Sequence, residues 1–210
     1  GLTKIGIDRA LERGASGKRR IMEIQEDFFE ERVTQKSQFA PFVCTDYADK
    51  PAMPIYLKKG DIIITSSTHI SGVRIGHAGL VADGDMNTVL EANAYGTFSK
   101  QSSASEFFRR INFMVFRVSE QTADRDTVEK IVDYTEENLL GIPYEGLAGI
   151  FTDKNKIDKT QCAHLIWYAF NQFGIDLDSN GGLLVTPYDM SHSPHLELVQ
   201  VFGFDPETLW

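Results

Sequence analysis

The sequence predicts an α+β fold in which helices pack against an antiparallel sheet or small barrel. Two long segments after residue 120 repeat apolar residues at helical spacing, whereas short β-branched segments are separated by turn residues. The order of predicted elements, which is helix, strands, helix, helix and strand, fits this class. With 210 residues, 42% of them apolar and 24% charged, the chain can bury a core without disulfide bonds.

Residues 1–55 are expected to form a helical extension that packs on the main body, residues 56–210. A helix is predicted from Lys18 to Lys36 because apolar residues recur there at helical spacing. Prolines then break regular structure, and the loop that they predict contains Cys44, which we interpret as structural. These prolines are Pro41, Pro51 and Pro54.

The main body begins with a turn at Lys58–Asp61, followed by a short run of three isoleucines that predicts a strand. Residues 66–72 read as a polar loop, and Asp83-Gly84-Asp85 predicts a hairpin turn between the next two strands. The predicted strands cover residues 62–64, 75–82, 88–93, 113–118 and 196–202.

Three helices are predicted in the main body, the first of them a short one at residues 105–110. The second covers residues 124–140 and is capped by Asp124 or Asp126. The third covers residues 160–173 and carries an amphipathic stripe. The members of the stripe are Cys162, Leu165, Ile166, Ala169, Phe170 and Phe173.

Composition narrows the possible partners. A net charge of −9 and a pI near 5.0 disfavour nucleic-acid binding, and no segment has the roughly 18 consecutive apolar residues of a membrane span. The two cysteines can form neither a disulfide scaffold nor a four-thiolate zinc site. We therefore expect no nucleic-acid partner, no transmembrane segment and no metal site, with the oligomeric state left open. If a leader peptide has been removed, we expect the protein in the cell envelope or outside the cell; otherwise we expect it in the cytoplasm.

Cys162 is the first candidate for chemistry because it lies in the first turn of the helix predicted at residues 160–173. We expect Thr160 to cap this helix. The free backbone N–H groups and the dipole at a helix start lower the pKa of a thiol and favour the thiolate. The alternative is a small core residue, because a catalytic cysteine also needs a base.

His77 and Glu91 are the candidate base and the candidate orienting carboxylate. Each interrupts an apolar strand, where a carboxylate is costly to bury unless it is paired, and Gly76 and Gly79 leave space around the imidazole. A turn centred on Gly84 places His77 and Glu91 directly opposite each other, with Cβ atoms about 5 Å apart. A two-residue turn would place them on opposite faces instead. For His77 alone, the alternative is a satisfied core residue.

Tyr144 and Gln161 are candidate oxyanion-stabilising or substrate-binding residues. A tyrosine at a cleft edge can donate a hydrogen bond, and Gln161 with the backbone N–H of Cys162 lies at a helix start. For Tyr144 the alternative is a partly buried loop aromatic. His164 is expected to point away from Cys162. The other histidines, interpreted as solvated loop residues, are His69, His192 and His195.

Four short motifs occur in an informative order. They are Gly60-Asp61-Ile62-Ile63, Gly76-His77-Ala78-Gly79-Leu80, Val89-Leu90-Glu91-Ala92 and Gln161-Cys162-Ala163-His164-Leu165. Together they resemble the circularly permuted branch of the NlpC-type, papain-like cysteine peptidases, whose best-known members are the YiiX-like proteins. The segments Gly141–Tyr144 and Thr186–Pro194 are also similar to that group, so the resemblance covers roughly residues 56–203.

The resemblance implies a papain-like α+β fold in which the catalytic histidine precedes the cysteine. It implies Cys162 as nucleophile, His77 as base and Glu91 as third polar residue of a cysteine amidase or peptidase without a cofactor. Relatives in the unpermuted branch cleave amide bonds in cell-wall stem peptides, so these or related small peptides are the expected substrates. Two features differ from the family: Glu145 stands where aspartate is expected, and a long N-terminal segment is present that we expect to cover or shape the cleft.

Two other functions stay open at the level of sequence. The lecithin–retinol acyltransferase relatives share the permuted order and place a histidine two residues after the cysteine, as His164 is here. Such an enzyme would transfer or hydrolyse lipid acyl groups, although the sequence shows no apolar anchor and its acidic surface would repel anionic lipids. The remaining alternative is a non-catalytic module that captures a peptide or amino acid.

Overall fold

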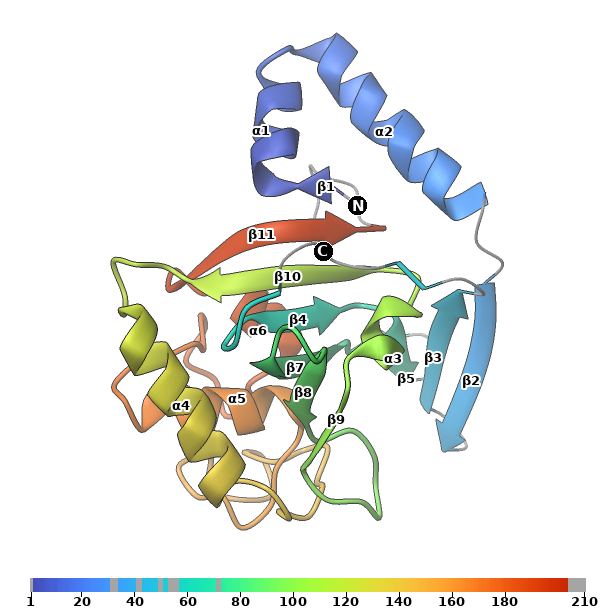
Figure 1. The fold of residues 1–210 in the computed structure, drawn as a ribbon. Helices are drawn as coiled ribbons and strands as arrows, with labels where there is room; N and C mark the ends of the chain where they lie inside the picture. The colour runs from blue at the N-terminus through green and yellow to red at the C-terminus, as the bar shows by residue number, and fades with distance from the viewer. Residues whose placement is uncertain are drawn as a thin grey trace.

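The computed structural model describes residues 2–30, 34–40, 43–48, 51–52, 57–70 and 73–203. Within these residues the main sheet has seven strands, and each neighbouring pair is antiparallel (Figure 1). The strands are β1 (Leu2–Thr3), β4 (Ile62–Thr65), β7 (His77–Asp83), β8 (Thr88–Glu91), β9 (Lys100–Ser103), β10 (Phe113–Val118) and β11 (Leu196–Phe202). Their order in space is β1-β11-β10-β4-β7-β8-β9. The predicted α+β class is confirmed.

Helices cover both faces of this sheet (Figure 1). One face carries α4 (Arg125–Asn138), α5 (Cys162–Asn171) and α6 (Pro187–Ser191), and the other carries α3 (Ser105–Phe108). The isoleucines of β4 point alternately toward the two sides and are all fully buried. Burial on both faces explains why β4 is apolar at successive positions. Within the described residues, no helix is both long enough and apolar enough to cross a membrane.

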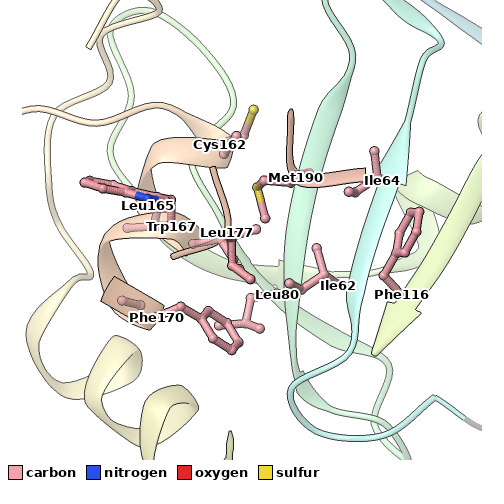
Figure 2. Close-up of a cluster of buried hydrophobic side chains, with 14 of the residues drawn as sticks. Ile62, Ile64, Leu80, Phe116, Cys162, Leu165, Trp167, Phe170, Leu177 and Met190 are labelled. Atoms are coloured by element: carbon pink, nitrogen blue, oxygen red, sulfur yellow. The ribbon is translucent and has the colours of Figure 1, made fainter. Parts of the chain in front are cut away.

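Strand β7 alternates between the two faces as the sequence predicts. Ala78 and Leu80 belong to the apolar cluster under α5, whereas Val81 belongs to the cluster under α3. Figure 2 shows Leu80 and Ile62 beside the side chains of α5. His77 shares its face of the strand with Val81, so the imidazole lies at the start of β7 on the side of α3.

The N-terminal segment contains strands as well as helices. Its further elements are α1 (Lys4–Leu11), α2 (Ala15–Glu30), β2 (Thr34–Ala40) and β3 (Val43–Ala48). The helix predicted for residues 18–36 therefore begins earlier, at Ala15, and ends earlier, at Glu30. Strand β1 pairs with β11 and α1 contacts β11, so these elements lie at the β11 edge of the sheet (Figure 1).

A second sheet of four strands accounts for two wrong predictions. In it, β2 and β3 join β5 (Thr68–Ile70) and β6 (Val73–Arg74) in the order β2-β3-β5-β6. Cys44 lies in β3 instead of a loop, and the stretch at residues 66–72 contains β5. The pairing of β3 with β5 joins segments far apart in the chain, so no local pattern predicts it. Pro41, Pro54 and Gly72, which were expected in loops, lie outside the described residues.

A buried ion pair fixes the turn before β4. Asp61 has no exposed surface, and its carboxylate accepts a hydrogen bond from the Lys58 N–H at 2.8 Å. The guanidinium of Arg117 in β10 donates two more, from Nε at 2.7 Å and from Nη2 at 2.8 Å. Burial of a carboxylate without hydrogen-bond partners costs free energy. These three donors offset that cost, so Asp61 can be buried in the turn.

The variant Asp61→Ala should lower the free energy of unfolding by about 2–3 kcal/mol, because it removes all three hydrogen bonds of a buried charge. The matched control is Asp133→Ala, which removes an ion pair with Lys59 at the surface and should cost less than about 1 kcal/mol. Urea denaturation of both variants at neutral pH measures the two losses. Equal losses of unfolding free energy in the two variants would show that the buried ion pair of Asp61 stabilises the fold no more than a surface ion pair does.

Candidate active site

The first turn of α5 is capped by Gln161, so the expectation that Thr160 is the cap is wrong. Gln161 has an extended backbone (φ −129°, ψ 177°), and its Oε1 accepts a hydrogen bond from the Ala163 N–H at 2.8 Å. Its Nε2 donates to the Val185 carbonyl at 2.5 Å, which holds the side chain in place. Glutamine is not among the preferred N-cap residues, so residue type alone favoured the wrong position.

Cys162 occupies the first position of α5 and keeps 7% of its surface exposed. As a thiol it donates to Gln161 Oε1 at 3.2 Å. Burial raises the pKa of the thiol, but the charge and hydrogen bond of His77 and the backbone N–H groups of Ala78 and Ala163 lower it below its ordinary value. In Figure 2 the sulfur points away from the apolar side chains of α5.

A hydrogen bond across the sheet joins His77 and Glu91. His77 Nε2 lies 2.7 Å from Glu91 Oε2, and both side chains are buried. Burial lowers the pKa of His77, yet the charge and hydrogen bond of Cys162 and the bond to Glu91 outweigh this and raise the pKa above its ordinary value. Because Nε2 is engaged with Glu91, Nδ1 is the ring nitrogen left for Cys162.

The pairing of β7 with β8 differs from the predicted register by two residues. The observed register places Glu91 opposite Gly79 instead of opposite His77. The turn occupies residues 84–87, with Asn87 at φ 51°, and β7 contains a bulge. A shift of two residues keeps a side chain on the same face, so His77 and Glu91 are diagonal neighbours. The predicted proximity is therefore confirmed and the predicted register is wrong.

Two residues that the sequence analysis did not identify hold the other oxygen of Glu91. Ser102 Oγ donates to Glu91 Oε1 at 2.6 Å, and Asn93 Nδ2 donates to it at 3.2 Å. Burial raises the pKa of Glu91, but His77, Ser102 and Arg110 lower it to about 2. Ser102 belongs to β9, a polar edge strand that the residue pattern does not predict. Asn93 lies two residues after Glu91 in the sequence, and this spacing is the signal from which its contact with Glu91 could have been predicted.

Tyr144 lies in the loop before α5, within electrostatic reach of the thiol. It is half-buried and packs edge-to-face on Tyr95, with 5.1 Å between the ring centroids. Burial and then the charge on Cys162 raise the pKa of Tyr144, so the phenol stays protonated and can donate a hydrogen bond. The side chain of Gln161 instead caps α5 and holds the thiol, and its role as an oxyanion donor stays a prediction.

The remaining histidines do not contact the thiol in the described hydrogen-bond network. His164 is fully buried, and its Nε2 donates to the Lys154 carbonyl at 2.8 Å, in keeping with the expectation that it points away from Cys162. His69 lies in β5 with Nε2 3.4 Å from Asp46, so the expectation of a solvated loop residue is wrong there. The other two lie near α6, with His192 exposed and His195 half-buried.

The described part of the N-terminal segment lies in two places, and the expectation that it covers or shapes a cleft stays a prediction. Helices α1 and α2 lie at the β11 edge, away from α5 (Figure 1). In β3 of the same segment, the ring of Tyr47 lies 5.8 Å from the guanidinium carbon of Arg110.

Comparison of this chain with models of protein families, with curated proteins and with solved structures finds no match. The imidazole of His77 interacts with the thiol of Cys162, whose pKa is lowered, and forms a hydrogen bond with the buried carboxylate of Glu91. Nucleophilic catalysis by a cysteine requires these three kinds of group in this order.

The carboxylate of Glu91 should make the stability of the fold depend on acid pH. Its pKa falls from an ordinary value of 4.5 to about 2 in the folded protein, so its contribution is present above pH 4.5 and is lost as the pH falls toward 2. The stability difference between the wild type and Glu91→Gln should therefore shrink by about 3 kcal/mol between pH 5 and pH 2. Urea denaturation across this range measures it.

A matched control is Glu129→Gln, which alters an exposed carboxylate in α4 that lies 2.8 Å from Arg125. Its stability should follow the wild-type curve, because exposed ion pairs contribute little. A constant difference between the wild type and Glu91→Gln from pH 5 to pH 2 would show that the charge of Glu91 adds nothing to folding.

Proposed function

We propose that this protein is a cysteine amidase or peptidase with a papain-like fold, related to the circularly permuted NlpC-type enzymes. The observation that carries the proposal is the 2.7 Å hydrogen bond between His77 and Glu91, in a site where the same imidazole lowers the pKa of Cys162. Carboxylate, imidazole and thiol supply an orienting group, a base and a nucleophile. The α+β fold and the order of the four sequence motifs also support the proposal.

The first half of the proposed reaction forms an acyl-enzyme. The thiolate of Cys162 attacks the carbonyl carbon of the amide, and the electron pair of the C=O bond moves to the oxygen. The imidazolium of His77 donates its Nδ1 proton to the leaving nitrogen, the C–N bond breaks, and a thioester remains on Cys162. Glu91 keeps the ring oriented and stabilises its positive charge throughout.

The second half releases the acid. Neutral His77 takes a proton from a water molecule, whose oxygen attacks the thioester carbonyl. The C–S bond then breaks, the carboxylic acid leaves, and the thiolate and imidazolium of the resting site are restored. Each proton that leaves His77 in the first half returns in the second, so the cycle requires no metal or organic cofactor.

Three groups near the thiol are candidates for stabilising the oxyanion. The backbone N–H of Cys162 lies at the first position of α5, where the helix offers no carbonyl to bond. The protonated phenol of Tyr144 and the Nε2 of Gln161 are the side-chain donors. Gln161 already gives one Nε2 hydrogen to Val185, so its second hydrogen would serve the substrate.

The substrate class follows from the sequence resemblance. Enzymes of the unpermuted branch cleave amide bonds in cell-wall stem peptides, and we propose these or related small peptides as substrates. The low exposure of Cys162 suits a small or extended chain better than a folded protein.

The variants Cys162→Ala and His77→Ala should each lower kcat/KM for hydrolysis of cell-wall tri- and tetrapeptides by about a thousandfold or more, because each removes a member of the nucleophilic pair. Release of the free amine, followed by chromatography and mass spectrometry, measures the rates. The matched control is His192→Ala, an exposed histidine at the end of α6, which should keep the wild-type rate. Equal activity in the wild type and Cys162→Ala would remove Cys162 as the nucleophile.

A second candidate function, hydrolysis or transfer of lipid acyl groups, is favoured by a different observation. Large apolar side chains are exposed on the loops around Tyr144, with Phe151 72% and Leu183 69% exposed. Exposed apolar side chains that gather near one site mark a surface for lipid or protein. We call these residues the apolar rim, and they are Phe98, Leu147, Ile150, Phe151 and Leu183.

If the second candidate is correct, phosphatidylcholine vesicles should yield lysolipid in the presence of the wild type but not of Cys162→Ala. The double variant Phe151→Ser with Leu183→Ser should lower the rate about tenfold, because it removes two apolar contacts with the bilayer. Met86→Ser is the matched control, since Met86 is equally exposed but lies in the turn after β7. Peptide cleavage without any lysolipid would exclude the second candidate.

A further inference from the structure

The imidazole of His77, the ring of Phe107 and the guanidinium of Arg110 are stacked in that order, and we call these three groups the column. The ring of Phe107, from α3, stacks on the His77 ring with 5.1 Å between centroids and 15° between planes. The guanidinium carbon of Arg110 lies 5.2 Å from the centroid of Phe107. Phe107 is fully buried and Arg110 is 6% exposed, so the column lies inside the fold.

Arg110 is held in this column by contacts from the second sheet. Its Nη1 donates to Thr68 Oγ1 at 2.7 Å and contacts Ser67 Oγ at 3.5 Å. The ring of Tyr47, in β3, lies 5.8 Å from the guanidinium carbon. A buried guanidinium is costly unless its surroundings bind it, and here two hydroxyls and two aromatic rings do so.

Gly79 is the feature of β7 that lets Phe107 approach the imidazole. A Cβ at this position would lie 2.9 Å from both Cε2 and Cζ of Phe107, closer than real Cβ contacts allow. Glycine inside a strand weakens the strand and is typical of a close approach by another group. The space that the sequence predicts around the imidazole is thus occupied by the stacked ring.

We propose that Phe107 and Arg110 are positioning residues for His77, with Phe107 fixing the plane of the imidazole and Arg110 fixing Phe107. The inference rests on the proposed role of His77 as the base. The hydrogen bond to Glu91 restrains Nε2 but leaves the ring free to tilt about that end. A stacked ring removes this freedom, so Nδ1 stays directed at Cys162.

Arg110 also adds positive charge beside the reacting groups. It lowers the pKa of Glu91 and works against the protonation of His77. Removal of this charge should therefore make both the thiol and the imidazole bind protons more strongly. The titratable groups that face Arg110 are Tyr47, Glu91, Glu106 and Cys162, together with His77 across the Phe107 ring.

Alkylation of Cys162 by iodoacetamide tests the column in the chain of residues 1–210 and requires no known substrate. Peptide mass spectrometry separates Cys162 from Cys44 and gives the rate from pH 5 to pH 9. Phe107→Leu and Gly79→Ala should each slow alkylation at pH 6 by about fivefold, because the first removes the stacked ring and the second displaces it. Phe108→Leu is the matched control, since it is buried on the same helix and packs on Phe113 instead of His77.

Arg110 is tested by a variant that removes the charge and one that keeps it. In Arg110→Met the pH midpoint of Cys162 alkylation should rise by about 0.5–1 unit, whereas Arg110→Lys should restore most of the wild-type midpoint. A midpoint that stays at the wild-type value in Arg110→Met would contradict the charge effect of Arg110, and an alkylation rate equal to that of the wild type would contradict its role in holding Phe107. Near-ultraviolet circular dichroism of each variant reports whether the fold is kept.

The outcomes separate this inference from the proposed function. Equal alkylation rates in the wild type and in His77→Ala would overturn the proposed thiol–imidazole pair and this inference with it. Rates that depend on His77 but are the same in Phe107→Leu, in Gly79→Ala and in the wild type would overturn this inference alone. Equal slowing by Phe107→Leu and Phe108→Leu would also overturn it, because the effect would then belong to the core in general.

Discussion

The hydrogen bond between His77 and Glu91 constrains everything around it, because it places a carboxylate and an imidazole inside the fold. A buried carboxylate must be paired and hydrogen-bonded, and Ser102 and Asn93 supply donors to the oxygen that His77 does not use. The bond also fixes which ring nitrogen faces the thiol. Strands β7, β8 and β9, together with Asn93 after β8, thus contribute one connected set of polar contacts.

The thiol reaches this set because α5 packs against β7. Cys162 lies at the start of the helix and His77 at the start of the strand, so the packing of α5 against β7, in the apolar cluster that contains Leu80, Leu165 and Phe170, sets the separation of sulfur and imidazole. The helix start then contributes backbone N–H groups that favour the thiolate. Chemistry and core packing are therefore coupled, since a shift of α5 on the sheet would separate the two reacting groups.

The elements with strong local patterns were predicted well. Strands β10 and β11 have the predicted bounds, and Asp124 caps α4 as one of the two residues proposed for it. The wrong predictions involve interactions between distant segments or competition between neighbouring residues. The register of β7 with β8 depends on a turn of four residues instead of one centred on Gly84, and the cap of α5 depends on a bond from Gln161 to Val185.

Residue patterns determined the α+β class, the face of β7 that carries His77, and the three residues proposed for catalysis, because strand alternation and helix spacing are local properties of the chain. The contacts that surround those residues depend on the tertiary structure. Neither Phe107, Arg110 nor Ser102 has a sequence signal that distinguishes it from an ordinary core or surface residue. Phe107 acquires its contact with His77, Ser102 its contact with Glu91 and Arg110 its contact with Phe107 because packing brings these distant segments together, and such contacts leave no periodicity in the sequence.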